Sequence, residues 1–64
     1  MDKKMTLEQA RKFAEFAAWK AGAAAWRYGG VNRWNTAWAA LDAATNSNVC
    51  EEIMAAANAA MEVA

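Results

Sequence analysis

The sequence has no histidine, no proline and a single cysteine, Cys50, in 64 residues. An intrachain disulfide needs two cysteines, and one cysteine without histidine cannot supply the four ligands of a structural zinc site. We therefore expect neither a metal nor a cofactor. A lone thiol is typical of a reducing compartment, and we expect a cytoplasmic protein of the producing or host cell.

Long hydrophobic runs are also missing. The most apolar stretch, residues 13–26, is interrupted by Glu15 and Lys20. It is shorter than the roughly 20 apolar residues that a membrane-spanning helix requires. Charged residues near the N-terminus, among them Glu8 and Arg11, interrupt any apolar core of a secretory signal. The sequence therefore predicts a soluble protein with no membrane partner.

Alanine dominates what is present, with 19 of the 64 positions. Alanine has the highest helix propensity of all residues, and β-branched residues are few in this chain. The length allows one domain, residues 1–64. A chain this short buries only about 60% of the surface it exposes when unfolded, so small domains often need a metal, disulfides or self-association. We predict a single all-α domain that is completed by oligomerisation.

Turn and capping residues divide the chain into three helices. Thr6 followed by Gln9 forms a capping-box pattern, and the pair Gly29–Gly30 provides a helix stop, which predicts a long first helix over about residues 6–28. Asn32 is a preferred N-cap and predicts a second helix over residues 33–45.

The third helix follows a polar cluster at residues 45–48. Either Ser47 or Asn48 could cap it, and Glu51 and Glu52 in its first turn would interact favourably with the helix dipole. We predict a third helix over residues 48–63.

Helical periodicity predicts which faces pack together. The first helix has one apolar stripe with mostly alanine in its middle: Leu7, Ala10, Phe13, Ala14, Ala17, Ala18, Ala21, Ala24, Ala25 and Tyr28. Small side chains allow close approach of helix axes, near the low end of the ~8–10 Å range. The second helix has the stripe Trp34, Ala37, Trp38 and Leu41. The third has a comparable stripe, which consists of Val49, Cys50, Ile53, Ala56, Ala57, Ala60 and Met61.

The first helix carries a second apolar stripe away from the alanines. Trp19 and Trp26 are seven residues apart and share one side, and Phe16 lies between the two stripes. In one interpretation, Trp34 and Trp38 fold over this side and make a thick aromatic core.

In the other interpretation, the second stripe faces another chain. We favour this interpretation because a domain of this size has little room for four tryptophans that bury about 150–250 Å² each. Exposed apolar patches usually mark interfaces, which prefer aromatic residues and arginine. The predicted interface residues are Trp19, Trp26, Trp34, Trp38, Phe16 and Arg27.

Catalytic groups are not evident in the sequence. General acid–base catalysis would depend on carboxylates alone, and Glu51 and Glu52 are adjacent, so they point in different directions on a helix. Cys50 and Ser47 have no recognisable base near them in sequence. We expect that the protein is not an enzyme.

One segment could bind a small anion. Helix N-termini bind anions, and the turn after the first helix places Tyr28, Arg33, Trp34 and Asn35 beside such a terminus. Arg33 could reach a phosphate while the aromatic rings stack on a base, so a homo-oligomeric nucleotide-like ligand binder is an alternative. The simpler interpretation, which we prefer, is that the two glycines end the first helix and Asn32 caps the second.

The charges are sorted along the chain. The first 33 residues hold all seven basic residues, including Lys3 and Lys4, with three acidic ones, whereas the rest holds only four acidic residues. This pattern permits a weak nucleic-acid binder that uses the basic first helix. We rank this alternative last, because phosphate binders usually carry an excess of positive charge and the net charge here is zero.

The function we expect is therefore a non-enzymatic protein-interaction module. It would associate with itself, as a homodimer or higher oligomer, and with a larger protein whose surface it blocks sterically. Short chains without catalytic motifs are often inhibitors of host factors encoded by phages or mobile elements, and we expect that role here.

Overall fold

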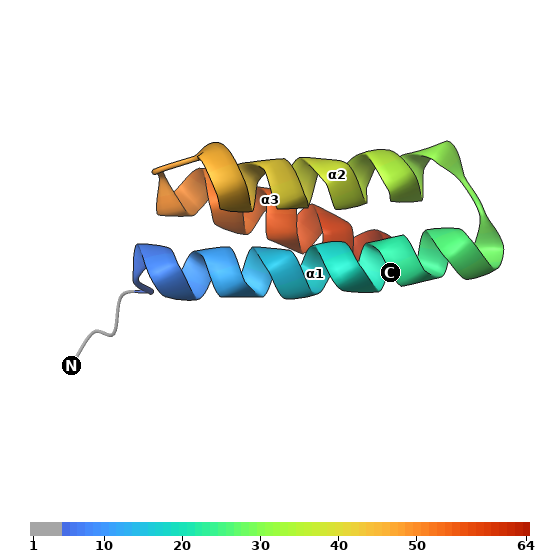
Figure 1. Ribbon diagram of the computed structural model, residues 1–64, viewed down its shortest axis with the longest axis horizontal. Coiled ribbons are helices and arrows are strands. Elements are labelled where there is room, and N and C mark those ends of the chain that lie inside the picture. The colour runs from blue at the N-terminus through green and yellow to red at the C-terminus, as the bar shows by residue number, and fades with distance from the viewer. Residues whose placement is uncertain (1–4) are drawn as a thin grey trace.

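The computed structural model describes residues 5–64, which form three α-helices: α1 (Leu7–Tyr28), α2 (Val31–Asn46) and α3 (Cys50–Val63). α2 runs back along α1, and α3 returns in the direction of α1 and packs behind both (Figure 1). The prediction of an all-α, three-helix fold with a long first helix is confirmed. Within the described residues, no helix combines the length and the apolarity needed to cross a bilayer.

The ends of α1 follow the predicted signals. The Thr6 side chain accepts a hydrogen bond from the Gln9 amide at 3.1 Å, and the Gln9 side chain accepts one from the Thr6 amide at 3.0 Å. This is the reciprocal capping box. At the other end, Gly29 and Gly30 have φ of 75° and 105°, a region that only glycine adopts without strain.

α2 begins earlier than predicted. Its N-cap position is Gly30, so Asn32 is not the cap and lies inside the first turn of the helix. The two glycines reverse the chain so tightly that helical geometry resumes at once at Val31. The backbone carbonyl of Asn32 then accepts a hydrogen bond from the Thr36 hydroxyl.

The start of α3 also differs from the prediction. Neither Ser47 nor Asn48 caps it; the N-cap position is Val49, which makes no side-chain capping hydrogen bond. The Ser47 hydroxyl instead accepts a hydrogen bond from the Val49 amide at 3.1 Å and lies 3.1 Å from the Glu52 carboxylate. This local turn uses the hydroxyl that would otherwise cap the helix, so α3 starts two residues later than predicted.

The interior consists almost entirely of alanine. Ile53 is the largest side chain that is fully buried among the described residues, and it packs with alanines from all three helices. The buried residues of α1 are Ala10, Ala14, Ala17, Ala18, Ala21, Ala24 and Ala25. The predicted alanine packing of α1 is confirmed.

All three predicted stripes need correction. On α3, Val49 and Met61 were predicted to be part of the buried stripe, but both are exposed. Tyr28 is 70% exposed, because it ends α1 and α3 stops short of that end (Figure 1). In α2 the buried face consists of Ala37, Ala40 and Ala44, not of the tryptophans. α2 therefore also turns its small residues inward and its large ones outward.

Candidate protein-docking groove

All four tryptophans lie at the surface and line one groove between α1 and α2. Trp19, Trp26, Trp34 and Trp38 are 80%, 84%, 41% and 63% exposed. The groove has a volume of about 430 Å³, and its lining is made of nine residues: Ala18, Trp19, Gly22, Ala23, Trp26, Trp34, Ala37, Trp38 and Leu41. We call this feature the tryptophan groove. The thick aromatic core that the sequence allowed does not form.

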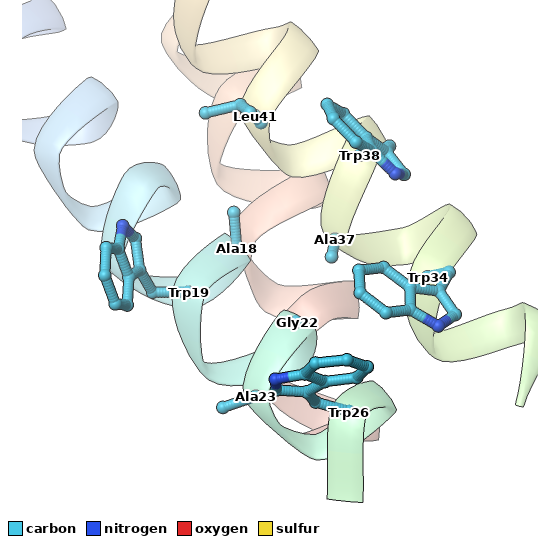
Figure 2. Close-up of a pocket in the computed structure, with 9 residues that line it drawn as sticks. All are labelled: Ala18, Trp19, Gly22, Ala23, Trp26, Trp34, Ala37, Trp38 and Leu41. Carbon is cyan, nitrogen blue, oxygen red and sulfur yellow. The ribbon is translucent and has the colours of Figure 1, made fainter. Parts of the chain in front are cut away.

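The groove has a floor of small residues and a rim of large ones. Figure 2 shows Ala18, Gly22 and Ala37 at the centre, with the four indoles and Leu41 standing around them. Two of the floor residues, Ala18 and Ala37, belong to the close seam that holds α1 against α2, since both are also buried in the core. Ala18 lies at the edge of the alanine stripe, so the groove extends from that edge to the tryptophan stripe of α1.

Helix geometry explains why the indoles meet. Trp19 and Trp26 are seven residues apart on α1, and Trp34, Trp38 and Leu41 follow one another at spacings of four and three on α2. The tight Gly29–Gly30 turn sets α2 antiparallel beside α1. Two apolar stripes that belong to different helices thus become one continuous patch.

The lining determines what the groove can do. Every lining residue is alanine, glycine, tryptophan or leucine, so no charged or titratable side chain takes part. Indoles offer large apolar faces and one N–H donor each. The groove can bind apolar side chains, but it supplies no acid, base or nucleophile for a reaction.

Two of the predicted interface residues lie outside the groove. Phe16 is half exposed, and the Lys20 ammonium lies over its ring, 5.6 Å from the centroid. Arg27 is exposed on the last turn of α1. Neither side chain is part of the groove lining. Leu41 lines the groove and lies on the predicted tryptophan stripe of α2, but it was not among the predicted interface residues.

Gly22 was also missed as a site residue. Its position between Trp19 and Trp26, at spacings of three and four residues, is the feature of the sequence that could have identified it. Such spacings place three residues on one face of a helix.

The residues of the alternative anion site have other partners or lie elsewhere. The Arg33 guanidinium donates hydrogen bonds to the carbonyls of Gly29 and Val63, both at 3.0 Å, and lies 5.6 Å from the centroid of the Tyr28 ring. It therefore ties the ends of α1 and α3 to the start of α2. Trp34 lies in the groove, and Asn35 is exposed on α2.

The basic residues do not gather in the groove. Arg11 donates hydrogen bonds to the Ser47 carbonyl at 3.1 Å and to the Asn48 side chain at 2.8 Å, which joins α1 to the loop before α3. Lys12 and Lys20 are exposed on α1. Lys3 and Lys4, part of the predicted basic region, lie outside the described residues.

Residues 5–64 contain no group of three acidic or cysteine side chains that could hold a metal ion. No known protein family, curated protein or solved structure matches this chain. What the protein does must therefore be inferred from its surface.

Proposed function

We propose that this chain is a non-enzymatic protein-interaction module that binds a helix of a protein partner in the tryptophan groove. One observation carries the proposal: all four tryptophans of the chain are exposed, and all four line the same groove. Tryptophan is among the residue types that contribute most to the affinity of protein interfaces. Leaving four of them in water is unfavourable unless another surface covers them.

The shape of the groove suits a helix. It runs between two antiparallel helices and has small residues along its floor, so bulky side chains of a third helix can reach down between the indoles. Helix-in-groove recognition uses apolar side chains at spacings of three and four residues. The partner segment we propose is an amphipathic helix with such an apolar stripe.

The chemistry of the lining favours protein over nucleic acid or lipid as the partner. Proteins that bind phosphates place lysine or arginine at the contact, and none lines the groove. Helices that lie on anionic membranes likewise combine their apolar face with basic residues. An uncharged aromatic lining matches the apolar stripe of a protein helix.

Steric masking is the mode of action that we propose. A 64-residue chain that covers a helix on a larger protein blocks any other partner of that helix. Inhibition of a host factor by a phage or mobile-element protein is one setting for this mode, and the small size of the chain supports it.

Site-specific photocrosslinking tests the proposal. A photoreactive phenylalanine analogue replaces Ala23, which lines the groove, or Ala39, which is exposed on α2 outside the groove. After irradiation in the producing cell, we expect protein adducts from position 23 and not from position 39, with mass spectrometry identifying the crosslinked protein. Absence of adducts from position 23, or equal adducts from both positions, would refute the groove as the docking surface.

A further inference from the structure

We infer that the helix occupying the groove is α1 of a second copy of this chain, so that two chains associate with their grooves face to face. This inference rests on the proposed function, because it names a second copy as the partner of the same groove. A helix of a larger protein would then have to displace that copy. Two features of the structure point to a second copy: the area of the exposed indoles and the position of Gly22. The spacing of Trp19 and Trp26 then shows where a two-fold axis would pass.

The exposed area matches the requirement of a dimer. With about 250 Å² for a whole tryptophan side chain, the four exposed fractions correspond to roughly 650 Å² of indole surface per chain. Two copies that cover each other would bury about 1,300 Å² from the indoles alone. Stable protein interfaces bury about 1,200–2,000 Å² in total, so the groove is large enough.

Gly22 has no role in the packing of a single chain. It lies in the interior of α1, where glycine destabilises a helix relative to alanine. A Cβ atom added at this position would meet nothing within 4 Å, so no contact within the chain requires its absence. Glycine allows another backbone to approach closely, and the open space at Gly22 leaves room for a backbone from a second chain.

The tryptophans of α1 are arranged symmetrically about the same point. Trp19 and Trp26 stand on either side of Gly22 and Ala23 in the groove lining. A two-fold axis between Gly22 and Ala23 makes the two α1 helices antiparallel and sets Trp19 of each copy beside Trp26 of the other. Such an interface is isologous, because the same patch is used twice.

In the resulting dimer, each copy covers the exposed indoles of the other. α1 and α2 of both copies form a four-helix arrangement, in which the two α1 helices approach each other at Gly22 and the indoles of each copy pack against the other copy. No like charges meet at the centre, since no charged residue lines the groove. The large side chains thus form the core of the dimer, while the alanines form the core of each chain.

Sedimentation velocity over a range of micromolar concentrations tests the inference, with the variant Gly22→Leu and the control Ala39→Leu. Leucine is a good helix former, and a Cβ atom at position 22 meets nothing within 4 Å, so we expect the single chain to fold. We expect the wild type and Ala39→Leu to sediment as two chains of 7.0 kDa each. Gly22→Leu should weaken dimerisation by more than about tenfold, while circular dichroism shows unchanged helix content.

Intrinsic fluorescence provides a second readout, because every tryptophan of the chain reports on the groove. Dilution of the wild type should shift the emission to longer wavelength and increase quenching by acrylamide, whereas Gly22→Leu should show the exposed spectrum at concentrations at which the wild type is still dimeric.

The outcomes separate the two proposals. A wild type that stays monomeric overturns the dimer, and so does a Gly22→Leu variant that dimerises as well as the wild type. If the wild type is monomeric and position 23 crosslinks to a different protein, the groove remains a docking surface and only the second copy is excluded. If position 23 crosslinks to nothing, both proposals fail.

Discussion

The interior of the bundle and the tryptophan groove use apolar residues in opposite ways. The buried positions among residues 5–64 are twelve alanines and Ile53. The groove, on the outer side of the same two helices, displays four tryptophans and Leu41 to the surface. In most small domains the large side chains are inside, because they gain most from leaving water.

Different residues therefore stabilise the fold and provide the surface for binding: the alanines hold the helices together, and the large side chains line the groove. Alanine contributes little buried area per residue, but it favours the helix and lets helices pack closely. The fold therefore depends on helix propensity, close packing and a few anchoring groups such as Ile53 and Arg33. The large side chains remain free for a partner. Substitutions in the two regions should accordingly differ in what they change.

The largest effect on stability is expected for Ile53→Ala. Ile53 is the largest fully buried side chain in the described structure, and its truncation should lower the free energy of unfolding by about 2–5 kcal/mol. Urea denaturation followed by circular dichroism measures the change. The control is Met61→Ala on the same helix, where the side chain is 38% exposed and the loss should be much smaller. Equal losses for both variants would contradict the assignment of the core.

An intermediate effect is expected for Arg33→Ala. Its guanidinium donates hydrogen bonds to two backbone carbonyls, and their loss should destabilise the fold by about 1–2 kcal/mol, near the lower end for charged donors because the side chain is only half buried. Thermal denaturation checks the change, with the exposed Arg27→Ala as a control. Unchanged stability of Arg33→Ala, combined with loss of binding to a nucleotide, would instead support an anion site at this turn.

The smallest effect on stability is expected for Trp26→Ala. Trp26 is 84% exposed, so its removal should change the free energy of unfolding of a single chain by no more than about 0.5 kcal/mol. Urea denaturation at a concentration too low for self-association measures it. A loss above about 2 kcal/mol would mean that Trp26 belongs to the core of the chain.

Much of the fold could be predicted from sequence because its signals are local. The Thr6–Gln9 capping box and the two glycines set the ends of α1 through bonds and dihedral angles within a few residues. The predicted starts of α2 and α3 were wrong where two local signals competed. At Asn32 the tighter glycine turn determined the start, and at Ser47 the hydroxyl bonded within the loop.

The site was only partly predictable. Periodicity identified the second apolar stripe on α1 and the tryptophan stripe on α2, and it suggested that one of them faces outward. It could not show that both stripes form one groove, since that depends on how α2 is rotated against α1. Leu41 and Gly22 line the groove because of the same packing of α2 against α1.

The sequence by itself determined that the chain is helical, where α1 begins and ends, and that its alanines form a close seam, since propensity, capping and periodicity act over a few residues. Only the tertiary structure decided that alanines fill the core while all four tryptophans stay outside. That choice depends on the rotation of each helix about its own axis. Close packing along the alanine seam sets the rotation and leaves the indoles between α1 and α2, where the single chain has nothing to cover them.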